Sequence, residues 1–333
     1  MFSPVFPLAY PLYDLIKEIK NIGKYLIYKE MLRNLIKKAG YEHEEEQYLS
    51  VIRDLIANGC SQEGRNGTTI CDIGAAMVFS LDGGKLPLMT TKQLAWKTCL
   101  KELLWFIKGS TDNEQLTRQK CYIWNGNSSR DYLDSRGLTH LKENDLGPVY
   151  GFQWRHFNGE YVDCHTDYSG VGVDQLAYII DALKGDVESR HSRRLVMTAW
   201  NPCQLDAMAL PPCHLLCQFH VTGGDQLTCS MYQRSGDVGL GVPFNIASYS
   251  FLTHLIAHHC GLKAKEFVYY LGNTHIYDDH IEQLKEQLER KPYEFPKLEI
   301  VGEKKGDISD YVLEDFVVKD YVCHPTIKME MRV

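Results

Sequence analysis

Segments with strand character alternate irregularly with segments of helical character, and this alternation limits the folds that the chain can form. The strand-like segments CHLLCQFHVTGG and QLTCSMYQR are joined at residues 223–225, and an apolar helical run follows at residues 245–259. No internal repeat and no low-complexity linker interrupts the pattern. We therefore expect one α/β (α+β) domain that begins near residue 43.

Further elements follow from apolar periodicity and turn residues. EHEEEQ opens a helix that ends at Gly59, and TTICDIGAAMVFSLDGG is typical of a strand that ends in a turn. We also expect a helix over residues 93–108, a strand at RRLVMTAW, and a helix through HIEQLKEQLERK that ends before Pro292.

Residues 1–42 differ from the rest of the chain. Apolar residues recur at helical spacing from Leu12 to Ala39, with seven Lys or Arg residues between them. The segment contains acidic residues and only one arginine, which disfavours a transit peptide. We expect an accessory helical extension of unknown role, although binding to a partner or a membrane surface stays open, and a catalytic domain over residues 43–333.

Charge and cysteine usage narrow the class of protein. The net charge is −7, and no basic block suggests a nucleic-acid arm. No apolar run approaches the roughly 20 residues that span a bilayer, so no membrane association is expected. The eleven cysteines are irregularly spaced, without a Cys-x-x-Cys pair, which favours a reduced protein of the cytoplasm or the nucleus whose cysteines mostly pack in the core.

Two motifs contain residues suited to chemistry. YQRSGDVGLGVPFN runs from a strand into a helix, and its Arg234 and Ser235 lie among glycines. Such a segment could bind a phosphate, but glycine-rich turns between a strand and a helix are common, so the signal is weak by itself. In LPPCH, two prolines precede Cys213 and fix the backbone there. Cys213 is a candidate nucleophile, and inert packing is the competing interpretation.

Other candidates are ambiguous from pattern alone. Glu102 in KELLWF is either a buried acid/base group or a residue on the exposed face of an amphipathic helix, and the pattern favours exposure. Arg193 and Arg194 open a strand and could contact an anion. His254 and His258 have the spacing of a metal-binding pair, but Leu255 stands where a metalloprotease has glutamate, so we expect no metal site.

Taken together, TTKQ, KELLWFIKGST, IWNGN, DLGPVYGFQWRHF, MALPPCH, YQRSGDVGLGVPFNIASY, GNTHIY and PHPTIKMEM resemble thymidylate synthase. The motifs occur in the family's order from about His43 onward, and their wording is closer to the eukaryotic and viral branch. The resemblance implies a large mixed sheet packed against helices and a homodimer formed through that sheet. It also implies reductive methylation of dUMP to dTMP, in which 5,10-methylenetetrahydrofolate donates carbon and hydride and leaves as dihydrofolate.

The same resemblance assigns roles at the site. Cys213 adds to C6 of uracil, Glu102 with Tyr150 moves protons, and His214 and Asn245 assist at the reacting centre. The residues implied for dUMP are Arg65, Gln233, Arg234, Ser235, Asn245, His275 and Tyr277, together with Arg193 and Arg194 of the partner subunit. The residues implied for folate are Ile123, Trp124, Asn127, Leu210, Asp237, Leu240, Gly241, Phe244 and Met331.

The sequence departs from the family pattern at several places. Asn125 and Asn273 stand where aspartate is usual, Gln93 where arginine is common, and Arg332 where the closing tail has a small residue. We expect these changes to alter folate affinity rather than activity. The alternatives are a dUMP or dCMP 5-hydroxymethylase on the same fold, against whose dCMP form Asn245 argues, and a non-catalytic relative that binds nucleotide or folate.

Overall fold

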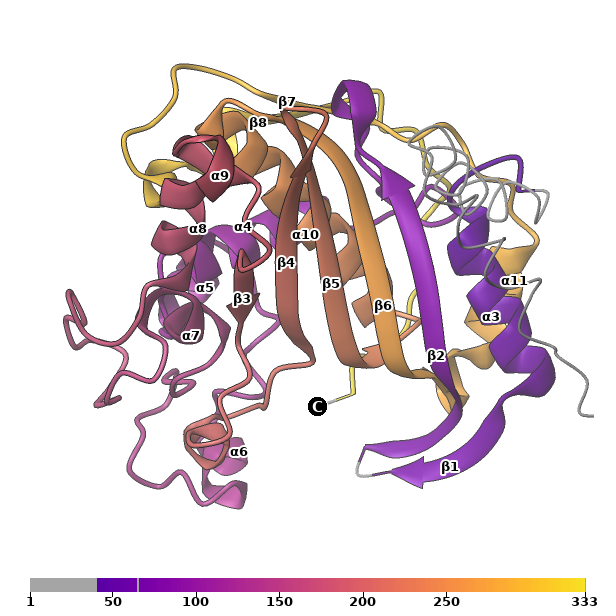
Figure 1. Cartoon of the computed structure of the whole chain (residues 1–333). Helices are drawn as coiled ribbons and strands as arrows, with labels where there is room; N and C mark the ends of the chain where they lie inside the picture. Colours follow the sequence, from indigo (N-terminus) through magenta and orange to yellow (C-terminus); the bar gives the residue numbers. More distant parts are fainter. Residues whose placement is uncertain (1–40, 65, 333) are drawn as a thin grey trace, which may run out of the picture.

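A six-stranded mixed sheet forms the centre of the molecule (Figure 1). This computed structural model describes residues 41–64 and 66–332, so the expected helical extension over residues 12–39 lies outside the described residues. The strand order is β1-β2-β6-β5-β4-β3, and β5 and β6 are its parallel pair. The bounds are β1 Cys60–Gly64, β2 Gly67–Ser80, β3 Val196–Thr198, β4 His214–Thr222, β5 Gln226–Asp237 and β6 Lys263–Tyr277. The predicted α/β class with a large mixed sheet is confirmed.

Helices and a small second sheet surround this centre. The α-helices are α3 Glu46–Asn58, α4 Trp96–Ile107, α5 Asn113–Arg118, α6 Arg130–Ser135, α7 Tyr150–His156, α8 Gln175–Lys184, α9 Val187–Arg190, α10 Gly241–Cys260 and α11 Ile281–Leu288. The short 3₁₀ helices are η1 Asp82–Gly84, η2 Leu205–Ala207, η3 Asp278–His280, η4 Ile308–Asp310 and η5 Leu313–Asp315. The strands β7 Lys297–Ile300 and β8 Phe316–Lys319 pair antiparallel.

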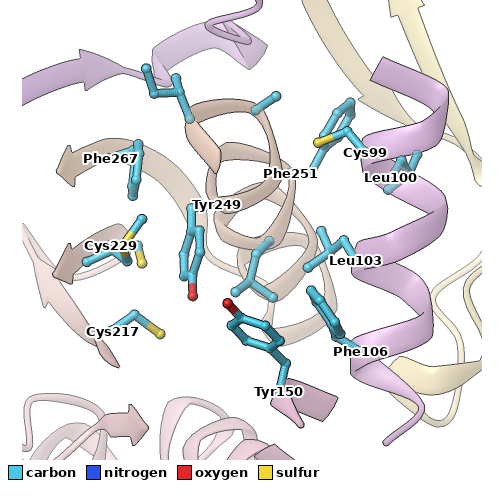
Figure 2. Close-up of a cluster of buried hydrophobic side chains, with 14 of the residues drawn as sticks. Cys99, Leu100, Leu103, Phe106, Tyr150, Cys217, Cys229, Tyr249, Phe251 and Phe267 are labelled. Carbon is cyan, nitrogen blue, oxygen red and sulfur yellow. The ribbon is translucent and has the colours of Figure 1, made fainter. Parts of the chain in front are cut away.

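Helix α10 is the central helix and lies behind the large sheet in Figure 1. It is buried around almost its whole circumference, as expected of a helix enclosed by a sheet and other helices. Figure 2 shows Tyr249 directed toward Phe267 of the sheet, whereas Phe251 is directed toward α4. The helix ends at Gly261, which has the left-handed conformation (φ 72°) that glycine adopts without strain.

The elements predicted after residue 42 are present, with shifted bounds. Helix α4 begins at Trp96 rather than at residue 93, α10 begins four residues before the expected start, and β3 covers only Val196–Thr198. The fifteen-residue strand β6 was not predicted. Its polar outer positions and its central glycine hide the alternation that marks a strand, while pairing on both sides stabilises it.

In the part of the chain that the structure describes, no helix covers the face of the sheet opposite α10 (Figure 1). Tyr232 of β5 and Tyr270 of β6 lie side by side in the register, and both side chains are more than one third exposed. Such large exposed aromatic groups on an uncovered sheet are typical of a contact surface. Among the described residues, no helix combines the length and the apolar character needed to cross a membrane.

Candidate active site

The strand register brings three motifs together at one end of the sheet. His214 at the start of β4 pairs with Gln233, while Ser235 and Asp237 at the end of β5 pair with Asn273 and His275 of β6. A cavity of about 390 Å³ opens there. It is lined by Asn66, Asn127, Tyr132, Arg136, Leu210, Pro211, Cys213, Arg234, Ser235, Asp237, His275, Tyr277 and Arg332. Eight of these are residues that the resemblance assigned to catalysis, dUMP or folate.

Cys213 lies at this cavity with its backbone held on two sides. Its N–H donates to Tyr150 Oη (2.7 Å), and its carbonyl accepts from the backbone N–H of Arg234 (2.9 Å). The Arg234 guanidinium lies 3.7 Å from Cys213 Sγ. A neighbouring cation favours the thiolate form of a cysteine, which is the nucleophilic form.

Arg234 is itself fixed by the segment that precedes the cysteine. Its Nε donates to the carbonyl of Pro212 (2.8 Å) and one terminal nitrogen donates to the carbonyl of Pro211 (3.0 Å). The guanidinium also lies over the Trp200 ring, 5.7 Å from its centroid. The two sequence motifs are thus joined, since the proline carbonyls accept hydrogen bonds from the arginine of the other motif.

Glu102 on α4 is buried, so the exposed position favoured by the pattern alone is wrong. Its carboxylate accepts a hydrogen bond from Trp124 Nε1 (2.7 Å). Burial raises the pKa of Glu102 to about 7, and the Trp124 hydrogen bond partly opposes this shift. The group therefore exists in both protonation states near neutral pH, which suits a proton donor and acceptor.

Tyr150 connects the buried acid to the cysteine. Its ring lies 6.1 Å from Trp124 and stacks on His214 at a centroid distance of 4.2 Å. His214 Nδ1 lies 2.9 Å from Tyr249 Oη, and burial lowers the pKa of His214 to about 3. His214 is therefore neutral at physiological pH and serves as a polar, uncharged wall behind Cys213.

Asn245 at the start of α10 and Gln233 of β5 do not line the cavity themselves but lie next to residues that do. Asn245 is buried, and a side chain built at Gly241 would lie 3.9 Å from Asn245 Oδ1 and 3.8 Å from Asp237 Cβ, so these residues are neighbours. Gln233 is also buried, where its Oε1 accepts from Tyr269 Oη (2.7 Å) and its Nε2 donates to the Ser235 carbonyl.

His275 and Tyr277 lie at the end of β6, with their rings 5.3 Å apart. His275 Nδ1 lies 2.8 Å from Asn273 Oδ1, so the departure Asn273 orients this histidine. Burial lowers the pKa of His275, and Asp237 partly opposes this shift. The net pKa is lowered, so the ring is neutral near pH 7. The second departure, Asn125, is exposed and accepts from Asn113 Nδ2 (3.0 Å) and Thr117 Oγ1 (3.2 Å).

The residues implied for folate divide into two groups. Asn127, Leu210 and Asp237 line the cavity. The other six do not line it. Five of them are buried or partly buried, namely Ile123, Trp124, Leu240, Gly241 and Phe244, and Met331 is exposed. The departure Gln93 accepts a hydrogen bond from Thr326 Oγ1 (3.0 Å).

The structure does not bring Arg193 and Arg194 to the cavity of their own subunit. They precede Val196, which pairs with Gln218, five residues along β4 from Cys213. At roughly 3.3 Å per residue this is a separation of about 17 Å, and both arginines lie still farther along the strand direction. Their side chains are exposed. Arg65, also expected at the phosphate, lies outside the described residues.

Several residues of the site were missed from the sequence. Tyr132 and Arg136 line the cavity although their segment has the charged, polar character of a solvent-exposed helix. Beneath Asp237, buried His280 places Nδ1 3.9 Å from the carboxylate, and Lys92 Nζ donates to the Gly239 carbonyl. Burial lowers the pKa of Lys92 to about 8, while Asp237 opposes the shift. His280 and Lys92 are distinguished only by their buried positions, which periodicity does not reveal here.

In the described part of the chain, no group of three or more His, Cys, Asp or Glu side chains is arranged to hold a metal ion. His254 is buried with Nε2 2.9 Å from the Lys85 carbonyl, as expected of a structural histidine. The expectation that the cysteines pack in the core holds for Cys71, Cys99, Cys121, Cys217 and Cys229, whereas Cys60 and Cys203 are exposed.

Cys213 and Arg234 line the cavity at the end of the mixed sheet, and the buried acid Glu102 lies near it. This arrangement is that of an enzyme of the thymidylate synthase family. The family model described as "Thymidylate synthase" matches residues 46–333, and the chain belongs to this family. This confirms the predicted enzyme class, a methyltransferase, and the predicted activity, methylation of dUMP to dTMP with a methylenetetrahydrofolate cosubstrate.

Curated relatives agree with this assignment. The thymidylate synthase of Equine herpesvirus 2 is 53% identical over 292 residues, which cover 87% of this chain and 99% of the relative. The thymidylate synthase of Homo sapiens is 53% identical over 292 residues, 87% of this chain and 91% of the relative. A bifunctional dihydrofolate reductase-thymidylate synthase of Leishmania major is 53% identical over 293 residues, 87% of this chain and 56% of the relative.

Proposed function

We propose that this chain methylates dUMP through a covalent bond between Cys213 Sγ and C6 of the uracil ring. The observation that carries the proposal is the position of Cys213 at the cavity wall, with the Arg234 guanidinium 3.7 Å from its sulfur. C5 of uracil is a poor nucleophile. Addition of the thiolate at C6 moves the C5–C6 π electrons toward C5 and the C4 carbonyl, which makes C5 enolate-like and able to attack carbon.

Methylenetetrahydrofolate supplies the one-carbon unit and the hydride. The chain's own task is then to remove the proton from C5, release the sulfur from C6 and exclude water. Glu102, whose pKa is about 7, is the proposed group that accepts and returns protons, through ordered water and the Tyr150 hydroxyl. Tyr150 contacts the cysteine backbone directly, and the uncharged His214 stacked on it keeps the ring in place.

The cavity's polar groups explain how dUMP would be oriented. Arg234 and Ser235, with Arg65, are the proposed phosphate ligands, and His275 and Tyr277 the proposed partners of the sugar hydroxyl. Buried Asn245, supported by Gln233, is the proposed partner of the uracil edge, because a carboxamide both donates and accepts hydrogen bonds. Asp237, Asn127 and Leu210 line the same cavity and are the proposed contacts of the pterin side of folate.

We also propose a homodimer in which Arg193 and Arg194 complete the phosphate site of the partner subunit. Two observations support this. Both arginines lie too far along the sheet to serve their own cavity, and the uncovered sheet face exposes Tyr232 and Tyr270. A two-fold interface through this face would be self-complementary. We place the enzyme in the cytoplasm or the nucleus on the irregular cysteine pattern.

Residues 43–333 are the proposed catalytic domain, and residues 1–42 an accessory extension. All the site residues discussed above lie after residue 43. A chain that lacks residues 1–40 should therefore retain nearly unchanged kinetic constants. A truncated protein that folds, as judged by circular dichroism, but has lost activity would overturn this division.

One assay tests the proposed activity against its alternatives. The protein is incubated with dUMP and methylenetetrahydrofolate, dihydrofolate is followed by its absorbance, and the nucleotide product is identified by its mass. Dihydrofolate and dTMP in equal amounts are the expected products. A hydroxymethyl nucleotide without dihydrofolate would indicate the 5-hydroxymethylase, and the absence of any product would indicate a relative that only binds these ligands.

A further inference from the structure

The segment at residues 329–332, here termed the closing segment, is fixed to the turn η3 that follows β6. His280 Nε2 lies 2.8 Å from the Glu330 carbonyl. Arg332 makes two ion pairs with the same turn, at 2.8 Å to Asp279 Oδ2 and 3.5 Å to Asp278 Oδ1. Three consecutive residues, 278–280, thus supply the hydrogen bond to Glu330 and both ion pairs to Arg332.

The guanidinium held by this turn also forms part of the cavity wall. Arg332 lines the cavity that contains Cys213 and Arg234, and it lies over the Tyr277 ring, 5.8 Å from its centroid. A side chain built at Gly67 would meet Arg332 Nη1 at 3.5 Å, which places the guanidinium against the β1–β2 hairpin as well. The closing segment therefore already spans from η3 toward the hairpin across the mouth of the cavity.

We propose that Arg332 is an electrostatic latch: its ion pairs with Asp278 and Asp279 hold the closing segment across the cavity in the protein without ligands. The proposal rests on the proposed function only in taking folate, with dUMP, as the ligand whose binding the latch assists. The family resemblance implies a small residue where Arg332 stands, so we expect the latch to belong to this chain's own sequence.

The latch should lower the entropic cost of immobilising the closing segment when folate binds after dUMP. A segment that must be immobilised on binding lowers affinity, and a segment that is held beforehand does not. Because the side chains of Arg332, Asp278 and Asp279 are between about one third and one half exposed, their attraction is screened by salt. High salt should therefore loosen the closing segment in this protein.

The test compares Arg332→Met with Lys328→Met in the full chain without ligands. Lys328 lies exposed on the same stretch of chain and forms no ion pair within the described part of the chain. Both variants therefore lose one positive charge. Amide hydrogen exchange of residues 329–332, measured by mass spectrometry, should accelerate about two- to fivefold in Arg332→Met. It should stay unchanged in Lys328→Met. Equal exchange rates in the two variants would overturn the latch.

A double-mutant cycle separates the ion pair from a general effect on the segment. Asp279→Asn should accelerate exchange in the wild-type background and add little in the Arg332→Met background. Independent, additive effects would contradict the pairing. In a Cys213→Ala background, where no turnover consumes the ligands, the Kd of methylenetetrahydrofolate in the presence of dUMP should rise about two- to fivefold when Arg332→Met is added, and a fall would contradict the preorganised segment. Because the exchange measurement needs no turnover, its outcome is independent of whether the proposed function holds.

Discussion

Single residues at this site have properties that follow from burial rather than from residue type. Glu102 and His214 are both buried close to Tyr150, and burial moves their pKa values in opposite directions, to about 7 and about 3. The charged form of each group is disfavoured, so the acid is only partly ionised near neutral pH and the histidine stays neutral. Arg234 supplies the positive charge beside the thiol.

Glu102→Gln tests this account through stability as well as activity. The folded-state pKa of Glu102 is raised above its unfolded value of about 4.5, so ionisation of the buried group costs stability as pH rises from about 4.5 through 7. A neutral glutamine removes this cost. The variant should lose turnover by 10²-fold or more, yet gain on the order of 3 kcal/mol relative to wild type at pH 8, from about 1.4 kcal/mol per pKa unit.

The measurement is urea unfolding of both proteins at pH 5 and pH 8, with turnover recorded in parallel. The advantage of Glu102→Gln should shrink toward pH 5, where the wild-type carboxyl is protonated. If Glu102→Gln were less stable than wild type by the same margin at pH 8 and at pH 5, ionisation of Glu102 would not lower the stability of the folded protein, which contradicts this account.

Asn245→Asp should change the choice of base. A carboxylate accepts hydrogen bonds from an amino group but cannot donate to a carbonyl, so use of dCMP relative to dUMP should rise by roughly tenfold or more. The ratio of kcat/KM values measures it. Asn125→Asp is the matched control, because Asn125 is exposed outside the cavity and its ratio should not move. An unchanged ratio in Asn245→Asp would remove Asn245 from the uracil edge.

At the scale of elements, the sequence predicted the junction between β5 and α10, which carries several residues of the site. The glycines, Arg234 and the following helix were all expected there, because turn residues and helix starts have local sequence signals. Strand β6 was missed, although it carries His275 and Tyr277 and pairs with both β2 and β5. Its stability comes from neighbours far away in sequence, which no local pattern encodes.

The packing of this junction against the closing segment predicts the effect of Gly239→Ala. A methyl group at residue 239 would lie 2.8 Å from His280 Nδ1 and 3.1 Å from Met329 Sδ. Contacts this short force neighbours to move, so the free energy of unfolding should fall by about 1–3 kcal/mol and folate should bind more weakly.

Gly306→Ala is the control for this substitution, because a methyl group at residue 306 would meet nothing within 4 Å. Its unfolding free energy should stay within about 0.5 kcal/mol of wild type. Urea unfolding and folate titration measure both quantities. If the two alanine variants have equal stability and equal folate affinity, the junction does not need its glycine.

For the whole molecule, the alternation of strand-like and helical segments predicted the α/β class, whereas the gathering of Cys213, Arg234 and Asp237 was predicted only through the family resemblance. Pattern alone put Glu102 on an exposed face, since periodicity cannot show what covers a helix on its polar side. It also could not show Tyr132, Arg136 or His280 at the site. Their positions depend on how distant elements pack, which only the folded chain determines.

The proposed shared site predicts complementation between inactive subunits. In a heterodimer of Cys213→Ala and Arg193→Ala subunits, both changes fall on one active site and the other site is intact. Random exchange makes half of the dimers mixed, so mixing should restore about a quarter of wild-type activity from two weakly active parents. Turnover after refolding the mixture from denaturant measures it. Activity equal to the mean of the parents would place Arg193 outside the partner's site.

The central claim is that Cys213 forms the bond to the nucleotide, and Cys213→Ala tests it most directly. Its contacts to Tyr150 and Arg234 through the backbone do not need the sulfur, so the variant should fold and bind dUMP with a Kd within a few-fold of wild type by calorimetry. Dihydrofolate and dTMP should not form at any measurable rate. Continued production of dTMP by a folded Cys213→Ala protein would contradict the account.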